Sequence, residues 1–270
     1  MPLKRDGDHR WVEMEFLVRG TPEQVWNAVA TGPGLSSWFT ETQVEERVGG
    51  SIRFDFGGGM TSSGVVTGWQ PPHRVTYEET DWAEGAPPLA TEVTVIARGG
   101  RCVVRMVHSL FTSDDQWDDQ FDGFESGWRG FFEILRLYLT KFADREAAAV
   151  RVSAWLDGGV DEVWRKLGDA LGFTGANVGD TRSAPASAPR FAGSVERIVQ
   201  TRASREITLL LDSPGSAIGW AAAFSWGGKS RAAVSLFLYG DEAAAEAARA
   251  KPDWEAWIDR LFPAAANAPS

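Results

Sequence analysis

The stretch from Phe121 to Phe142 constrains the fold more than any other part of the chain. Its large apolar residues recur every three or four positions: Phe124, Trp128, Phe131, Phe132, Leu135, Tyr138, Leu139 and Phe142. This spacing covers one face of an α-helix, and Arg129, Glu133, Arg136 and Lys141 take the other face. Asp122 is in position to cap the start of the helix. A helix of about twenty residues is roughly 30 Å long, the span of a small domain. Almost everything before it has the pattern of strands, so we expect this helix to pack across one curved sheet.

The residues before this helix alternate between apolar and polar types, as half-buried strands do. We expect strands at Trp11–Arg19, Thr42–Val48, Ser51–Phe56, Gly64–Trp69, Arg74–Asp81, Ala90–Ala97 and Arg101–Leu110. Two short helices are expected after the first strand, one capped by Thr21 with Pro22 at its first position and one over Leu35–Phe39. The Gly and Pro turns between the strands are short. They favour an antiparallel meander, because parallel pairs need crossovers of about a dozen residues or more.

Composition argues against several classes of function. The 270 residues carry a formal net charge of −10 without a block of Lys or Arg, so neither nucleic acid nor an anionic membrane is an expected partner. We find no apolar run long enough for membrane insertion and no secretory signal, and therefore expect a cytoplasmic protein. His9, His73, His108 and the single cysteine, Cys102, form no pair with metal-ligand spacing. Neither a metal nor a cofactor is expected.

The order of these elements resembles the START-like, helix-grip superfamily (SRPBCC). In that fold a bent antiparallel sheet grips a C-terminal helix around a deep apolar cavity. The resemblance rests on Gly-Thr-Pro-Glu-Gln-Val-Trp at 20–26, Trp38-Phe39, Gly49-Gly50, His108-Ser109 and Gly127-Trp128. Together these motifs are similar to the branch named after the activator of the heat-shock ATPase (AHSA-type), over residues 10–143. The resemblance implies an α+β fold with a curved antiparallel sheet around the long helix.

The second half of the chain repeats the beginning of the first. The Val-Trp pair at 163–164 echoes the pair at 25–26, at the constant offset that also relates 158–162 to 20–24. Further strands are expected at Val150–Leu156, Ser194–Thr201, Glu206–Leu211, Ile218–Ser225 and Ala232–Tyr239. Thr181–Pro189 is expected to be a loop, and Asp241–Arg249 with Trp254–Leu261 a closing helix that Pro252 interrupts or kinks. We predict two START-like domains, a complete one at 1–145 and a reduced one at 146–270, with any large pocket in the first.

The expected cavity lies between the sheet and the long helix of the first domain. The resemblance and strand alternation suggest as its walls Trp38, Phe54, Phe56, Trp69, Tyr77, Met106, His108, Phe124, Trp128 and Phe131. Plain core packing is an equally good explanation for each aromatic residue among them. The chain has 13 tryptophans, a high count that makes a ring-lined cavity worth testing.

Three polar residues are candidates for chemistry in that cavity. Alternation places His108 on the same face as Met106, and Tyr77 and Glu79 on the same face as Val75. His108 is either a ligand anchor or general acid/base, or a histidine satisfied by a backbone or hydroxyl partner. Glu79 is either a cavity carboxyl or, as we expect, a strand-end residue that reaches solvent.

Two classes of function remain, and we favour binding of an apolar, aromatic or lipid-like small molecule. The alternative is an enzyme without a cofactor, like the polyketide cyclase and dehydratase members of the resembled superfamily. A protein-interaction role, as in the co-chaperone that names the branch, rests on the family name alone.

Overall fold

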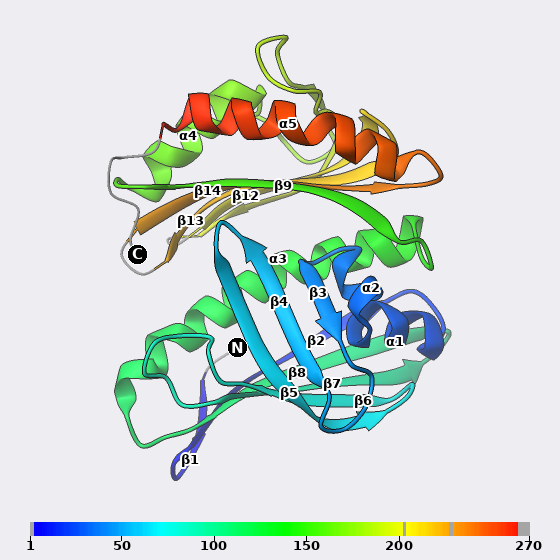
Figure 1. The fold of residues 1–270 in the computed structure, drawn as a ribbon, viewed down its shortest axis with the longest axis vertical. Helices are drawn as coiled ribbons and strands as arrows, with labels where there is room; N and C mark the ends of the chain where they lie inside the picture. Colours follow the sequence, from blue (N-terminus) through cyan, green and yellow to red (C-terminus); the bar gives the residue numbers. More distant parts are fainter. Residues whose placement is uncertain (1–2, 202–203, 227–228, 264–270) are drawn as a thin grey trace. The chain divides into compact units, whose positions relative to one another are not determined.

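The computed structural model describes residues 3–201, 204–226 and 229–263; the side chains of residues 116, 118–127, 129 and 226 fall outside this description. The chain divides into two compact units, Met1–Glu146 and Ala147–Ser270. Each unit is α+β and is built on one antiparallel sheet, as the sequence predicts (Figure 1). No helix in the described ranges is both long and apolar enough to cross a membrane.

The first unit follows the expected order of strand, short helices, meander and long helix. Its elements are β1 (Lys4–Asp6), β2 (His9–Val18), α1 (Pro22–Ala30), α2 (Gly32–Ser36), β3 (Glu41–Val44), β4 (Ser51–Gly57), β5 (Met60–Gln70), β6 (Arg74–Glu79), β7 (Leu89–Arg98), β8 (Arg101–Phe111), the 3-10 helix η1 (Asp115–Trp117) and α3 (Asp118–Lys141). The sheet order is β1-β2-β8-β7-β6-β5-β4-β3. The meander therefore folds back so that its last strand, β8, pairs with β2.

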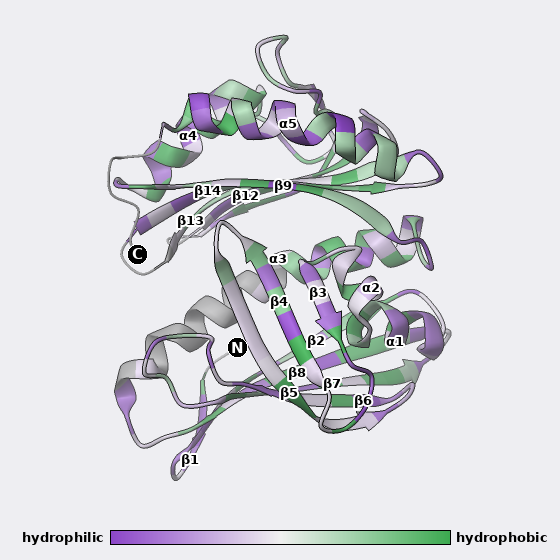
Figure 2. Ribbon diagram, viewed as in Figure 1, coloured by the Kyte–Doolittle hydropathy of each residue, from purple (hydrophilic) through white to green (hydrophobic). Residues whose placement is uncertain are grey.

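Strand alternation produces one apolar and one polar face of this sheet. On β2, Val12 and Met14 are buried at 1% and 2% exposure, whereas the intervening Glu13 lies on the opposite face. Figure 1 shows the sheet curving around α3, and Figure 2 shows hydrophobic and hydrophilic residues alternating along strands such as β4. The buried face of the sheet and α3 together enclose the core of the unit.

Local sequence signals fix the two short helices. Thr21 caps α1 in a capping box with Gln24, and Pro22 occupies the first turn. The second helix begins earlier than the expected Leu35, because Thr31 accepts a hydrogen bond from the backbone N–H of Gly34 and so caps a turn that starts at Gly32. The Gly-Pro-Gly sequence at 32–34 thus forms the first turn of α2, directly after α1 ends at Ala30.

The long helix α3 also begins earlier than predicted. Its N-cap is Trp117, without a side-chain cap, and Asp122 lies within the helix. The predicted Asp122 cap is therefore wrong, since the chain enters α3 directly from the η1 turn in helical conformation. On the side facing the sheet, Phe132 and Leu135 are buried at 2% and 0% exposure.

The second unit has a similar topology with fewer elements. They are β9 (Ala147–Leu156), α4 (Val160–Leu171), β10 (Thr181–Ser183), β11 (Ala192–Gln200), β12 (Ser204–Ser213), β13 (Ala217–Trp226), β14 (Lys229–Tyr239) and α5 (Ala243–Leu261). The sheet order is β10-β11-β12-β13-β14-β9, so the last strand again pairs with the first. This shared order supports the prediction that the second unit is a reduced copy of the first, which stays a prediction.

Two details of the second unit differ from expectation. The segment expected to be a loop at Thr181–Pro189 contains β10, which pairs with β11 through Arg182 and Gly193. Helix α5 continues through Pro252, so an interruption there is wrong, while a kink at Pro252 stays a prediction. A proline removes only one helical hydrogen bond, so the turns before and after it can both persist.

Candidate functional site

The space between the sheet and α3 of the first unit is almost filled by side chains. We call this space the chamber; it is lined by Val29, Leu35, Trp38, Phe54, Tyr77, Val93, Val104, Met106, Trp128 and Phe132. The cavity that remains is about 10 Å³, room for about one water molecule. This is far smaller than the deep cavity that the family resemblance implies, because the aromatic rings on both sides interlock.

Phe39 stands at the centre of these rings. Its ring centroid lies 4.8 Å from that of Trp128 and 4.7 Å from that of Phe131. It also makes edge contacts with Phe54 and Phe56, at 6.1 and 5.8 Å. Such tilted and edge-on pairs are the arrangements that aromatic quadrupoles favour. The sequence analysis did not include Phe39 among the site residues, although the Trp38-Phe39 pair contributed to the resemblance.

Most of the predicted wall residues that can be placed come together here. Trp38, Phe54, Tyr77, Met106 and Trp128 line the chamber directly. Phe56 and Phe131 do not line it; they pack on Phe39, which contacts the lining residues Phe54 and Trp128. Trp69 does not line it: its ring packs edge-on against Trp26 of α1, with centroids 5.0 Å apart. The side chain of Phe124 lies outside the described residues.

His108 of β8 is buried on the inner face of the sheet, at 2% exposure. Its Nδ1 lies 2.8 Å from Thr91 Oγ1 on the neighbouring strand β7, and the two share a hydrogen bond. The ring of Trp128 covers it, with centroids 5.7 Å apart. Burial lowers the pKa of His108 to about 3, so the imidazole is neutral near pH 7. A hydroxyl partner for this histidine was one of the two alternatives from the sequence.

Tyr77 of β6 lies beside the same threonine. Tyr77 pairs with Thr91 across β6 and β7, and Thr91 pairs with His108 across β7 and β8. Burial, and then the nearby Glu79 carboxyl, raise the pKa of the Tyr77 hydroxyl above its usual value. The phenol therefore stays protonated and acts as a neutral hydrogen-bonding group. Tyr77, Thr91 and His108 form one row across three strands.

Glu79, at the end of β6, is buried at 7% exposure. The expectation that it reaches solvent is wrong, because its carboxyl turns inward and accepts a hydrogen bond of 2.5 Å from the hydroxyl of Ser62 on β5. Burial raises the pKa of Glu79 to about 7, against the effect of the Ser62 hydrogen bond. A carboxyl with this pKa can take up and release a proton near neutral pH.

The structure thus joins His108, Tyr77 and Glu79 with two partners that the sequence analysis missed. Thr91 shares the alternation of Val93, which was a usable signal for an inward side chain. Ser62 fell outside the expected strand at Gly64–Trp69, whereas β5 begins at Met60. All five side chains are less than 10% exposed. We call these five residues, Ser62, Tyr77, Glu79, Thr91 and His108, the polar row.

In the described part of the second unit, the buried polar side chain of Glu206 binds Ser204 and Trp220 and lies outside the cluster that packs on the helices. The buried cluster between its sheet and helices α4 and α5 consists of apolar side chains, among them Leu167, Leu209, Val234 and Trp254. Within the described ranges of the chain, no three His, Cys, Asp or Glu side chains gather to hold a metal ion. The chamber of the first unit is therefore the candidate site.

Residues 19–140 match the model of the family described as "Activator of Hsp90 ATPase homolog 1-like protein". This match confirms the AHSA-type resemblance over most of the first unit. Among proteins with curated functions, none has a significantly matching sequence.

Several solved structures are similar to this chain. CalU16 from Micromonospora echinospora is 18% identical, with 52% of this chain and 83% of that one covered and a TM-score of 0.42. DynU16, from the dynemicin biosynthetic locus, is 18% identical, with 93% and 97% covered and a TM-score of 0.44. The Aha1 dimer from Colwellia psychrerythraea is 21% identical, with 48% and 95% covered and a TM-score of 0.41.

Proposed function

We propose that the AHSA-type unit matched at residues 19–140 binds a flat or lipid-like apolar small molecule in the chamber. The observation that carries this proposal is the polar row. A core that serves only stability gains little from five buried polar side chains, since each must be desolvated and then satisfied. Ligand sites commonly combine apolar walls with a few convergent polar groups. The chamber has apolar walls, and the polar row adjoins it through Tyr77, the one member of the row that lines it.

The ligand needs space that the chamber does not have in its closed arrangement. Trp128 is the ring most suited to provide it, because it is only partly buried, lies over His108 and contacts Phe39 and Phe132. If its indole swings aside, a flat molecule can take its place against the polar row. The ligand would gain about 25 cal/mol per Å² of apolar surface removed from water, before association costs, which is consistent with micromolar affinity.

Isothermal titration calorimetry with 2-naphthol and with palmitate tests the proposal. We expect micromolar binding of one of them, with a negative heat-capacity change. Trp128→Ala should bind more tightly, since it removes the ring that occupies the site. Met106→Trp should bind more weakly, because it fills the chamber from the opposite wall. Val107→Trp is the matched control: Val107 neighbours Met106 on β8 but points to the other face of the sheet.

The contrary result is well defined. If neither the wild type nor Trp128→Ala binds either probe while both remain folded, the chamber is a packed core. The protein-interaction role then stands as the remaining function for this unit.

A second candidate is an enzyme that uses the same chamber without a cofactor. The observation in its favour is that the pKa of Glu79 is about 7, which suits a general acid or base. Glu79→Gln keeps the size and hydrogen bonding of the side chain but removes its proton exchange. In an enzyme this change should spare binding and lower turnover by roughly 10²–10⁴-fold. If the unit only binds its ligand, neither the wild type nor Glu79→Gln should show turnover.

A further inference from the structure

We propose that Ser62 and Asp81 form the path by which the buried Glu79 carboxyl exchanges protons with solvent. This inference rests on the proposed function only in assigning Glu79 to the site, and it adds two residues that take part in its chemistry. Glu79 is buried, so a proton needs a route between its carboxyl and the surface.

The geometry places one hydroxyl between two carboxyl groups. Ser62 Oγ donates a hydrogen bond of 2.5 Å to Glu79 Oε2 and lies 3.5 Å from Asp81 Oδ1. Ser62 and Glu79 are buried at 4% and 7% exposure, whereas Asp81 is exposed. The backbone N–H of Ser63 donates to Asp81 Oδ1 at 2.5 Å and holds that carboxyl beside Ser62. The three side chains thus run in order from the surface to the buried Glu79 carboxyl.

A hydroxyl in this position can relay a proton because it has one hydrogen and two lone pairs. In the inward direction, a hydronium ion protonates the Asp81 carboxylate and becomes water, and Asp81 then donates that proton to Ser62 Oγ. At the same time Ser62 passes its own hydrogen to the Glu79 carboxylate. Asp81 and Ser62 each gain one O–H bond and lose one, and Glu79 ends with one proton more. Release from Glu79 follows the same steps in reverse.

The other ionisable groups near Glu79 do not offer an equivalent route. Tyr77 adjoins it on β6 and stays protonated, since its pKa is raised. His108 stays neutral near pH 7 and shares its hydrogen bond with Thr91. Asp81 is exposed and lies against Ser62, and its charge contributes to the raised pKa of Glu79. Glu78 is also exposed, but as the preceding residue of β6 it points to the opposite face of the sheet.

Carbon-13 NMR of protein labelled at the glutamate carboxyl carbon measures this exchange directly, with no ligand present. The Glu79 signal is assigned by its loss in Glu79→Gln, and its line shape is followed through the titration near pH 7. Ser62→Ala should slow proton exchange at Glu79 by about tenfold or more, equivalent to about 1.4 kcal/mol in the barrier. Asp81→Asn should also slow it and should lower the pKa of Glu79, because a repelling charge is lost.

Two further variants make the test specific. Ser62→Thr keeps the hydroxyl and should restore the wild-type rate. Ser63→Ala changes the neighbouring side chain but leaves the backbone N–H that holds Asp81, so it should exchange like the wild type.

An exchange rate in Ser62→Ala and Asp81→Asn equal to that of the wild type would overturn the path. If Ser62→Ala does not fold, Asp81→Asn decides, because its side chain is on the surface. Failure of ligand binding with slowed exchange would reject the proposed function and keep the path. Ligand binding with unchanged exchange would support the proposed function and reject the path.

Discussion

Thr91 Oγ1 lies 2.8 Å from Nδ1 of His108, and this contact fixes the imidazole on the inner face of the sheet. The histidine is held where water cannot reach it, so its neutral form is favoured. Burial also favours the neutral form of Glu79, on the same face, and raises its pKa to about 7. Burial thus disfavours the positive charge of one group and the negative charge of the other, and both effects change stability as the pH varies.

The first prediction is that Glu79 and His108 have opposite effects on the pH dependence of stability. The pKa of Glu79 rises on folding from 4.5 to about 7, so the folded state binds the extra proton and stability falls as pH rises through that window. The pKa of His108 falls on folding from 6.5 to about 3, so stability falls as pH drops through that window. Between pH 4.5 and 6.5 the two groups change the free energy of unfolding in opposite directions as pH rises, so their effects cancel in the wild type.

Variants that remove one of the two groups should reveal how the other changes the free energy of unfolding with pH. Relative to the wild type, the free energy of unfolding of Glu79→Gln should rise with pH by about 1.4 kcal/mol per unit in the shared window. That of His108→Gln should fall by about the same amount per unit. Urea denaturation at several pH values measures both. Parallel curves for the variants and the wild type would show that the two groups are not buried as described.

The second prediction concerns the packing of α3. Leu135 is fully buried, so Leu135→Ala should lower the free energy of unfolding by about 2–5 kcal/mol through the void it leaves. Phe131 is only partly buried, so Phe131→Ala should fall toward the lower end of that range. Arg136 is exposed, with an ion pair to Glu133, and Arg136→Ala should change stability by no more than about 0.5 kcal/mol. Denaturant midpoints in the reverse order would mean that another face of α3 packs on the sheet.

The sequence predicts the elements of the first unit well where its signals are local. Thr21 and Pro22 mark the start of α1, and alternation along β8 places Met106 and His108 on one face, as the structure has them. Element ends are less well predicted: Asp122 is a good capping residue, yet the helix starts before it because η1 leads into it.

The site is only partly predictable, because its chemistry depends on contacts between strands. Nothing in the sequence near Glu79 indicates Ser62, which lies 17 positions away and meets it only through the register of β5 and β6. The volume of the chamber is likewise unpredictable from the sequence. Whether Phe39, Trp128 and Phe131 line a cavity or fill it depends on how their rings interlock, which composition does not determine.

The third prediction concerns the close approach of α1 and α2. A Cβ added to Gly34 would lie 1.8 Å from the carbonyl oxygen of Asn27, a backbone atom that cannot move aside easily. Gly34→Ala should therefore destabilise the protein by about 1–3 kcal/mol. Gly168→Ala, within helix α4, should instead stabilise it by about 0.5–1 kcal/mol, since its nearest neighbour would be at 3.9 Å and alanine is the better helix former. Thermal denaturation of the two variants compares the signs directly.

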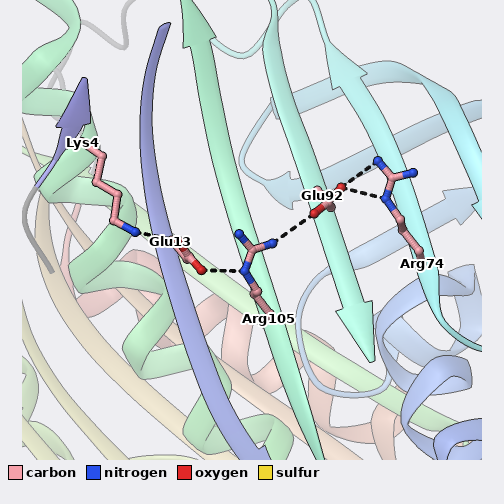
Figure 3. Close-up of polar contacts among 5 residues, drawn as sticks. All are labelled: Lys4, Glu13, Arg74, Glu92 and Arg105. Carbon is pink, nitrogen blue, oxygen red and sulfur yellow. Dashed lines mark hydrogen bonds and ion pairs between the residues drawn. The ribbon is translucent and has the colours of Figure 1, made fainter. Parts of the chain in front are cut away.

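The fourth prediction concerns the charged side chains on the outer face of the first sheet. Figure 3 shows Lys4, Glu13, Arg105, Glu92 and Arg74 linked in alternating charge across β1, β2, β8, β7 and β6. Arg105 is central, at 2.6 Å from Glu13 and 3.0 Å from Glu92. Its hydrogen bond to Glu13, followed by that of Lys4, lowers the pKa of Glu13 to about 2.

Arg105→Met should lower the free energy of unfolding by about 1 kcal/mol near pH 7, a value limited by solvent screening of these partly exposed groups. The lowered pKa of Glu13 means that its share of this stability is present above pH 4.5 and is lost as pH falls toward 2. The difference between Arg105→Met and the wild type should therefore shrink in that window and also at high salt. Arg47→Met is the matched control, since the Arg47–Glu45 pair is 65% and 54% exposed and should contribute almost nothing. A difference that stays constant from pH 7 to pH 2 and from low to high salt would mean that Arg105 acts through the packing of its aliphatic chain, not through its charge.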